Sequence, residues 1–518
     1  MSSDAMNNHS SRVVVVGAGH AGAAAALNLR RHGFHGEIVV LSEEADYPYD
    51  RPPLSKSLFN RAGGGTLAPE GAFTDRQIDL RLGVAADSLD VDARVVALTD
   101  GTRLPYTAVI LATGARPRQI DFGGSHEGRI GSLRTLDDAR QLEAALDPGG
   151  RLAVVGGGWI GLEVASAAKA SGRVATVIER EDRLLARVAS RQLSSFLTEL
   201  HLRCGVDIIT GRTVTGVGFG DGSDELQLDD GQRIGFDHML VAVGAIAEDT
   251  IARAAGLACE PAGVVVDDDG RTSHPDVFAI GDAACRSMPS SGRSARLESI
   301  PSALEQARRV AARIMGQASP PSEVPWFWST QHDLHIQIAG FPDTEDEVVV
   351  VGHLGASGGA ICHVRDGRLA CVEAVNAATT FNAARAAIAS GESFDPDALD
   401  LARAGTARRP PGTTLDVTFI LPDGQERSVG AEAGKSVMEA GRGAQVPGIV
   451  AECGGSCSCG TCHVYVDEAW REALEPPTQD ELEMLEYVDD LEDGSRLACQ
   501  IMMSSSLAGL AVRVAQNE

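Results

Sequence analysis

Residues 12–41 read RVVVVGAGHAGAAAALNLRRHGFHGEIVVL, and this stretch decides how the chain begins to fold. Both of its ends are continuous Val/Ile runs, which are typical of buried parallel strands. An alanine-rich helix is predicted between them, and the turn before it carries Gly17-x-Gly19-x-x-Gly22. Such glycines let the backbone approach a pyrophosphate at the helix N-terminus, and Glu43 after the second strand can accept a ribose hydroxyl. We expect a dinucleotide site, although a plain glycine-rich turn would give the same motif.

A second stretch repeats this order of strand, glycine turn, helix and strand: residues 151–178, RLAVVGGGWIGLEVASAAKASGRVATVI. It contains Gly156-x-Gly158-x-x-Gly161, and Glu179 closes its last strand. Two dinucleotide sites in one chain favour a flavin with a nicotinamide over a simple dehydrogenase. Glu179 would repel a 2′-phosphate, so we expect NADH rather than NADPH, although two arginines within the next four residues weaken this preference.

Three further apolar runs end at glycine, in residues 108–115, 239–245 and 276–282. Their order predicts two doubly wound α/β units, the second inserted in the first. From about residue 326 the pattern changes to mixed strands and helices. Residues 401–414 hold Pro, Gly, Thr and three arginines but no acid, which is typical of a linker. The following LDVTFILPDGQERSV predicts a hairpin with a Pro-Asp-Gly turn.

The composition fits several globular domains. With 518 residues, of which 43% are hydrophobic and 23% charged, the chain is long enough for three or four cores and is neither disordered nor fibrous. A formal charge of −27 argues against nucleic acid or an anionic membrane as the main partner. The N-terminus lacks the basic-then-apolar order of a signal peptide, and polar residues interrupt the apolar stretches. We therefore expect a cytoplasmic protein without membrane spans.

Cysteines gather at the C-terminal end, in the order Cys453-x5-Cys459-x2-Cys462 followed by Cys499 in RLACQI. Three thiolates on one glycine-rich loop with a distant fourth suit a 2Fe–2S cluster, although the first gap is one residue longer than in plant-type ferredoxins. Zinc sites usually come as two CxxC pairs, which are not present, so zinc or a thioredoxin-like site is the less favoured alternative. Cys457 fits neither spacing and is expected to stay outside the cluster.

Acidic residues concentrate in the same part of the chain. Residues 415–518 hold 19 acids and 6 bases, and residues 467–493 hold 12 acids and one base. A run of charge is often only a solvated face. Electron transfer, however, needs fast and steered encounters, so we favour a docking surface for basic redox partners.

Two families are resembled in succession. Residues 12 to about 400 resemble the FAD-dependent, NADH-oxidising ferredoxin reductases that serve bacterial oxygenases, through VVVVGAGHAG, YPYDRPPLSK, ILATGARPR, LRTLDDA, VVGGGWIGLE, VFAIGDAA, ESIPSALEQAR and VPWFWSTQHD. Residues 415–518 resemble adrenodoxin/putidaredoxin-type ferredoxins, through CGGSCSCGTCHVYV and SRLACQI. The resemblances imply FAD, NADH and a 2Fe–2S cluster as cofactors, with Cys453, Cys459, Cys462 and Cys499 as cluster ligands.

Site residues are carried over by position. The resemblance implies that Lys56 lies beside the flavin and pairs with Glu163, and that both tune it. The remaining expected cofactor contacts are Gly17, Gly19, Ala21, Gly22, Glu43, Arg51, Ala86, Ala112, Thr113, Gly114, Arg134, Gly156, Gly158, Ile160, Gly161, Glu179, Gly244, Asp282, Ile300 and Trp328. Taken alone, the aromatic residues of the PWFW segment would more often belong to a core.

The expected architecture is α/β, with two nested doubly wound dinucleotide-binding domains, an α+β reductase C-terminal domain and an α+β β-grasp ferredoxin. The expected boundaries are 1–120 with 245–325 for FAD, 121–244 for NAD, 326–400 for the C-terminal domain, 401–414 for the linker and 415–518 for the ferredoxin.

The implied activity is that of an NADH:ferredoxin oxidoreductase fused to its own ferredoxin. Hydride would pass from NADH to FAD, and single electrons would then pass through the cluster to a haem-thiolate or Rieske-type oxygenase. Flavin disulfide reductases share the layout of two dinucleotide sites, but they need a redox cysteine pair after the first motif, and the first cysteine here is Cys204. A flavin and iron–sulfur redox sensor is the rival hypothesis. Reductases and ferredoxins of these families are usually separate chains, so the fusion leaves open whether docking occurs in cis or in trans.

Overall fold

The computed structural model describes residues 10–516, except for positions 60–64, 70, 123–127, 220–223, 289–292, 356–357, 398, 400–413, 452, 456, 458, 486–487 and 489–490. The expected linker therefore lies, up to residue 413, outside the described residues. Two compact units are present, residues 1–66 with 70–327 and residues 67–69 with 328–518. Within the described ranges, no helix has both the length and the apolar character needed to cross a membrane.

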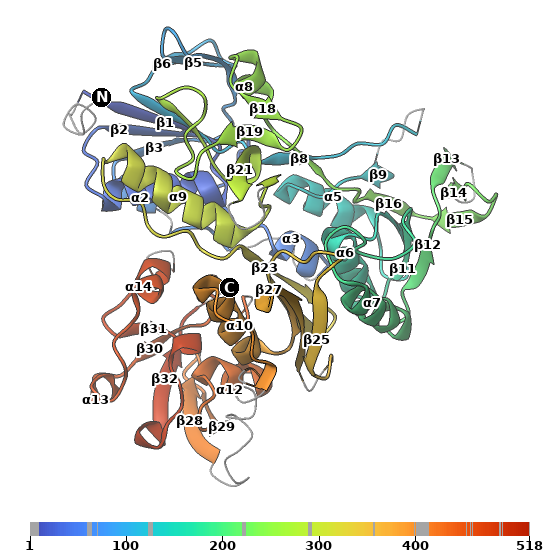
Figure 1. Cartoon of the computed structure of the whole chain (residues 1–518), viewed down its shortest axis with the longest axis vertical. Coiled ribbons are helices and arrows are strands. Elements are labelled where there is room, and N and C mark those ends of the chain that lie inside the picture. The colour runs from blue at the N-terminus through green and yellow to red at the C-terminus, as the bar shows by residue number, and fades with distance from the viewer. Residues whose placement is uncertain are drawn as a thin grey trace. The chain divides into compact units, whose positions relative to one another are not determined.

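A five-stranded parallel sheet begins the first unit, in the order β20-β7-β1-β2-β3. Its strands are β20 (Val277–Ala279), β7 (Ala108–Leu111), β1 (Arg12–Val16), β2 (Glu37–Leu41) and β3 (Ile78–Arg81). Helices α2 (His20–Arg31) and α9 (Ile300–Ile314) lie side by side (Figure 1). Because β20 returns to a sheet that starts at residue 12, the predicted insertion of one α/β unit in the other is confirmed.

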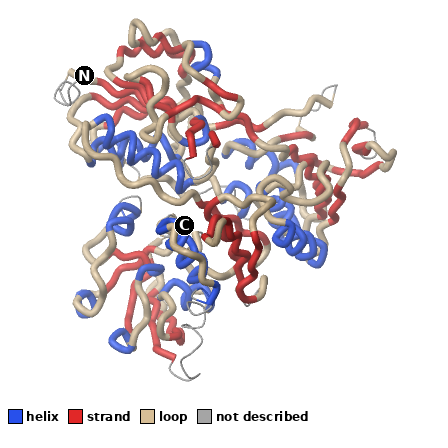
Figure 2. Tube along the Cα trace, in the orientation of Figure 1, coloured by secondary structure: helices blue, strands red, loops and turns tan. Residues whose placement is uncertain are grey.

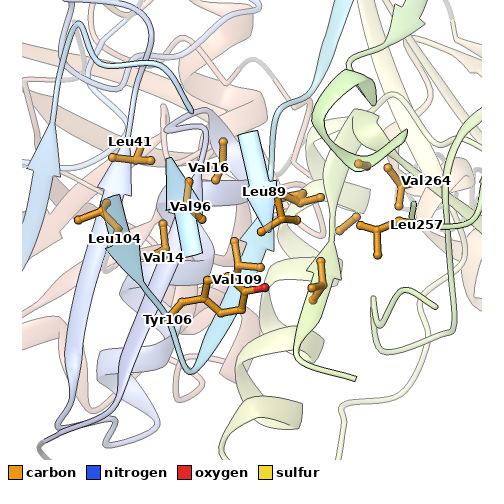
Figure 3. Close-up of a cluster of buried hydrophobic side chains, with 14 of the residues drawn as sticks. Val14, Val16, Leu41, Leu89, Val96, Leu104, Tyr106, Val109, Leu257 and Val264 are labelled. Carbon is orange, nitrogen blue, oxygen red and sulfur yellow. The ribbon is translucent and has the colours of Figure 1, made fainter. Parts of the chain in front are cut away.

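The core of this first domain lies between the parallel sheet and a smaller antiparallel one, β4 (Ala86–Asp90), β5 (Val95–Leu98) and β6 (Arg103–Pro105). Val14 and Val109 of the parallel sheet pack in one cluster with Val96 and Leu104 of the smaller sheet (Figure 3). Burial of these β-branched and leucine side chains gives about 1.5–3 kcal/mol each. The cluster holds the sheet rigid beneath the loops that follow its strands.

The inserted domain has its own parallel sheet, in the order β12-β11-β10-β16-β9. Its strands are β12 (Asp207–Thr210), β11 (Val174–Glu179), β10 (Arg151–Val155), β16 (His238–Val241) and β9 (Ile130–Gly131), with helices α6 (Trp159–Ala170) and α7 (Arg191–Arg203) and the antiparallel strands β13 (Val214–Gly218), β14 (Asp224–Leu228) and β15 (Arg233–Phe236). The antiparallel pair β8 (Ala115–Pro117) and β17 (Ala245–Ala247) joins the two domains at the points where the chain leaves and returns.

The other elements of the first unit are short. They are α3 (Pro53–Lys56), α4 (Ala72–Asp75), α5 (Leu136–Ala145), α8 (Thr250–Ala254), the 3₁₀ turn η1 (Gly281–Ala283), and the strands β18 (Cys259–Glu260), β19 (Gly263–Val266), β21 (Ala284–Met288) and β22 (Arg293–Ala295).

The second unit holds two separate sheets (Figure 2). The first runs β23 (Trp326–Gln331), β24 (Leu334–Gly340), β27 (Arg368–Val375), β26 (Gly359–Arg365) and β25 (Glu347–Gly352), and helix α10 (Ala378–Ser390) packs on it. The last four of these strands pair antiparallel. This is the predicted α+β domain.

The second sheet of this unit is mixed, in the order β29-β28-β32-β30-β31. Its strands are β28 (Thr414–Ile420), β29 (Glu426–Glu432), β30 (His463–Val466), β31 (Ser495–Leu497) and β32 (Leu510–Val514), accompanied by α12 (Val437–Gly443), α13 (Glu468–Arg471), α14 (Gln479–Leu485), η2 (Ala498–Gln500) and η3 (Ser505–Leu507). β28 and β32, the first and last of these strands along the chain, pair parallel with each other inside the sheet, and this is the predicted β-grasp. The predicted hairpin is confirmed, with Gly424 in its turn at φ +82°.

Candidate functional site

The first glycine loop is held against the strand beside it. Gly17 has φ +108°, and a Cβ there would lie 2.2 Å from the carbonyl oxygen of Ala112. A Cβ at Gly22 would lie 1.9 Å from the carbonyl oxygen of Gly17. Gly19 precedes α2, and the Cβ it lacks would come near only the Arg51 guanidinium among the described residues, at 4.0 Å. The outer glycines therefore serve close packing, whereas the middle one leaves room for a pyrophosphate.

Several predicted contacts meet at the carboxyl ends of the strands of this sheet. The Arg134 guanidinium pairs with Asp282 at 3.0 Å, and the Arg134 carbonyl oxygen accepts a hydrogen bond from Arg51 at 2.6 Å. Asp282 follows Gly281, whose φ is +67° and where a Cβ would lie 2.9 Å from Ala21. Ligands of open α/β sheets bind at this edge, so the arrangement fits a dinucleotide.

The loop after β7 supplies the next group of predicted residues. Ala112 is buried, the Thr113 hydroxyl donates to the Glu248 carbonyl oxygen at 2.5 Å, and Gly114 has φ +72° beside Arg134. These contacts fix the loop next to the first glycine motif.

For four other predicted residues, the structure gives the position and burial but no contact that marks a cofactor site. Glu43 lies two residues past β2 and is exposed, and its neighbour Glu44 is the residue that pairs with Arg51, at 2.6 Å. Ala86 begins β4 and Ile300 begins α9, and both are half-buried. Trp328 is buried on β23 of the second unit. Contacts of these four residues with a cofactor stay predictions.

A buried ion pair joins the two nucleotide-binding domains. Lys56 on α3 lies 3.2 Å from the carboxylate of Glu163 on α6, and the Glu163 side chain is 3% exposed. The other carboxylate oxygen accepts a 2.5 Å hydrogen bond from Ser55. A carboxylate taken out of water needs such partners, because an uncompensated buried charge is strongly destabilising. Lys56 and Glu163 are thus brought together as expected, with Ser55 as a partner.

The second glycine loop has the same geometry as the first. Gly156 has φ +112°, with its missing Cβ 2.4 Å from a backbone oxygen, and Gly161 packs on Gly156 in the same way. A Cβ at Gly158 would meet no described atom within 4 Å, so this position faces open space. The carboxylate of Glu179 accepts hydrogen bonds from the backbone N–H groups of Gly157 at 2.7 Å and of Glu181 at 2.8 Å.

Three residues lie beside this second loop: Trp159 and Ile160 at the start of α6, and Gly244 after β16. Trp159 packs edge-on against Phe327, with ring centroids 5.2 Å apart, and its buried indole N–H has no acceptor within the described ranges. Ile160 is 45% exposed although it is a large apolar residue. Gly244, with φ +99°, follows β16 beside the same loop. An unpaired donor and an exposed isoleucine fit a bound dinucleotide that would cover them.

The expected cluster ligands converge in the second unit. Cys462 is buried, and its pKa is raised well above the usual value, first because it shares a hydrogen bond with Cys499 and also through its burial and the nearby Cys459 and Cys453. The Cys459 sulfur accepts the backbone N–H of Cys453 at 3.3 Å and contacts the Thr461 hydroxyl at 3.0 Å. Thiols that lie close together, one of them accepting a backbone N–H of the loop, fit an iron–sulfur cluster.

Two more side chains border these thiols. Gln500 donates to the Cys499 sulfur at 3.2 Å. Burial lowers the pKa of Arg442 on α12, while the neighbouring Cys453 and Cys459 act in the opposite direction. Gln500 and Arg442 therefore form part of the electrostatic surroundings of the cluster ligands.

Sequence reasoning missed four of these contributors, namely Ser55, Trp159, Gln500 and Arg442. Ser55 adjoins Lys56 within PPLSK and could have been noticed there. It also missed Gln306 of α9, whose side-chain oxygen accepts the Gly281 N–H at 3.0 Å and so fixes the Asp282 turn. Gln306 lies within the motif ESIPSALEQAR, but its contact with the turn spans 25 residues and leaves no local pattern.

Comparisons with known proteins agree with this geometry. The model of the pyridine nucleotide-disulphide oxidoreductase family matches residues 11–307, the reductase C-terminal family matches 326–404, and the 2Fe–2S iron-sulfur cluster binding domain matches 420–504. The chlorobenzene dioxygenase ferredoxin reductase component of Cupriavidus sp. strain PS12 is 37% identical, over 75% of this chain and 94% of that protein. Putidaredoxin reductase CamA of Pseudomonas putida is 34% identical, over 76% of this chain and 95% of that protein.

A solved structure, the covalent putidaredoxin reductase–putidaredoxin complex, matches with a TM-score of 0.73 and 32% identity, over 78% of this chain and 100% of that one. The chain belongs to the ferredoxin reductases of the pyridine nucleotide-disulphide oxidoreductase family, and a 2Fe–2S domain follows its reductase part. The predicted cofactors, FAD, NAD and a 2Fe–2S cluster, are those of the matched families.

Proposed function

We propose that the chain takes electrons from NADH and delivers them, through its own ferredoxin domain, to an oxygenase. One observation carries this. No cysteine lies between the first glycine motif and Cys204, where a disulfide reductase carries its redox pair, whereas in the ferredoxin domain Cys462 shares a hydrogen bond with Cys499 and lies near Cys453 and Cys459. The chain thus carries the ligand set of a one-electron acceptor, and it lacks a cysteine pair at the position where disulfide reductases have theirs.

The bound flavin would supply the step between two-electron NADH and one-electron acceptors. The protein's own residues position the partners. The two glycine loops hold the two dinucleotides, Arg134 and Asp282 fix the turn at the carboxyl edge of the first sheet, and Lys56 keeps a positive charge beside Glu163 in a buried setting. Use of NADH and of reduced thiols favours work in the cytoplasm.

An absorption spectrum and steady-state turnover test this function. The purified protein should show flavin bands with a broad 2Fe–2S shoulder that NADH bleaches, and it should reduce cytochrome c continuously with NADH. Flavin and cluster that are reduced but support negligible turnover would favour the redox sensor instead.

The preference for NADH should depend on Glu179. Its carboxylate closes β11 and lies against the glycine loop, where it would repel a 2′-phosphate. In Glu179→Gln, kcat/KM should fall for NADH and rise for NADPH, which shifts their ratio by about 10-fold or more. Glu199→Gln, an exposed acid on α7 of the same domain, is the matched control. An unchanged ratio in Glu179→Gln would show that another residue selects the nicotinamide.

The acidic run of the ferredoxin domain includes both buried and exposed side chains. Glu481 on α14 is fully buried and pairs with Arg496 of β31 at 2.8 Å. Around α13, however, Asp467, Glu468, Glu472 and Glu475 are exposed. We infer that these four acids, called the α13 acids below, form part of the surface on which a basic electron acceptor docks.

Removal of the α13 acids should slow electron delivery. Their joint replacement by Asn or Gln should lower the second-order rate constant for cytochrome c, a basic acceptor, by about 10-fold at low salt. The difference from wild type should vanish near 0.5 M salt, because exposed charges are then screened. The control neutralises four exposed acids of the FAD domain, Asp87, Asp90, Asp92 and Asp100. An equal loss in both variants would point to net charge and not to this surface.

A further inference from the structure

Strand β24 of the reductase C-terminal domain contacts the loop that holds the expected cluster ligands. Gln337 on β24 is 1% exposed. Its side-chain N–H donates to the carbonyl oxygen of Cys453, at 3.2 Å, across 116 residues of sequence. Cys453 is the first of the four expected ligands. A glutamine buried on a β-sheet therefore binds the backbone of a ligand residue in the ferredoxin domain.

The next residue of the loop packs against the same strand. Gly454 has φ +65°, and a Cβ there would lie 2.3 Å from Nε2 of His335. A side chain here would both favour this left-handed backbone less than glycine does and collide with the buried imidazole, so glycine is required by the close approach. His335 is 4% exposed, and its backbone exchanges two hydrogen bonds of 2.8 Å with Asn376. The residue that Gly454 packs against, His335, is thus held on the sheet by its hydrogen bonds to Asn376.

Both contacts come from one face of β24, because residues 335 and 337 are two positions apart in a strand. The amide of Gln337 and the backbones of Cys453 and Gly454 carry no charge. Residues 328–518 form one compact unit, although two family models meet within it, at 326–404 and 420–504. The ferredoxin domain therefore contacts the reductase C-terminal domain through Gln337 and through the space that Gly454 leaves beside His335, and neither of these two contacts, together called the seat below, uses a carboxylate.

We propose that this seat is the docked state in which the ferredoxin domain receives electrons from the flavin of its own chain. The proposal rests on the proposed function. Each NADH gives up a hydride, that is two electrons, and becomes NAD⁺, and one proton is released when the flavin is reoxidised. The cluster holds one electron, so it would pass each electron to the external acceptor before it takes the next. Neither of the two contacts uses the α13 acids, which are exposed, so docking in cis at this seat is compatible with their proposed role toward an external acceptor.

Anaerobic stopped-flow mixing of the full chain with NADH tests the proposal. The first-order rate constant for cluster reduction should stay the same over a tenfold range of protein concentration and between low and 0.5 M salt. Gln337→Leu, which keeps the size of the side chain but removes the donor, should lower this rate constant by about 10-fold. Flavin reduction by NADH and the EPR spectrum of the dithionite-reduced cluster should not change. Gln425→Leu, an exposed glutamine in the β28–β29 turn, should match wild type.

Two results would overturn docking in cis at this seat. One is a rate constant that rises in proportion to protein concentration, since transfer would then occur between chains. The other is a Gln337→Leu variant that transfers electrons as fast as wild type. Failure of NADH to reduce the flavin, or of the reduced flavin to reduce the cluster at any concentration, would instead contradict the proposed function itself.

Discussion

Cys459→Ser should abolish NADH-driven reduction of cytochrome c, with a loss of at least about 100-fold, while the flavin is still reduced by NADH at the wild-type rate. Cys459 lies where a backbone N–H and the Thr461 hydroxyl both point at its sulfur. Without this thiolate the cluster should not assemble, so electrons should stop at the flavin. Steady-state cytochrome c reduction and single-turnover flavin bleaching measure the two steps separately.

Cys457 provides the matched control, because it lies on the same loop but fits no ligand spacing. Cys457→Ser should keep both the cluster spectrum and the turnover. If Cys459→Ser alone stays active, the double variant shows whether Cys457 has replaced the missing ligand. Activity that survives even in the double variant would mean that electrons leave the flavin without the cluster.

Lys56→Ala should slow flavin reduction by NADH by about 10-fold and lower the stability of the protein, because it leaves the Glu163 carboxylate buried without its counter-charge. Breaking such a pair costs about 3–5 kcal/mol, so the melting temperature should fall as well. Stopped-flow absorbance gives the rate, and thermal unfolding gives the stability.

Two further lysine variants separate charge from fold. Lys56→Arg keeps a cation near Glu163 and should recover much of the rate. Lys169→Ala removes a lysine at the opposite end of α6 and should leave flavin reduction unchanged. A Lys56→Ala variant that is less stable but reduces its flavin normally would show that the ion pair is only structural.

The glycine loops could be predicted from sequence because their geometry is local. Gly17 and Gly156 take left-handed backbone at the ends of buried strands, and a strand–turn–helix pattern is enough to recognise such positions. The cysteine spacing is local in the same sense for Cys453, Cys459 and Cys462. Fold and cofactor classes therefore followed from short motifs.

Contacts between distant segments could not be predicted in this way. Ser55 reaches Glu163 across 108 residues, and Gln337 reaches Cys453 across 116, and neither contact leaves a periodic trace in the sequence. Glu481 belongs to a run of acids that is expected to be exposed to solvent, yet it is buried and forms an ion pair with Arg496. Burial of a charge depends on a partner that only the folded chain supplies.

The central claim is that electrons from NADH reach the iron–sulfur cluster of the same protein. It is tested most directly by EPR of samples frozen anaerobically at intervals after mixing with NADH. The signal of the reduced 2Fe–2S cluster should grow as the flavin bands bleach, on the timescale of turnover and in nearly every chain. A cluster that stays oxidised while NADH keeps the flavin reduced would contradict the claim.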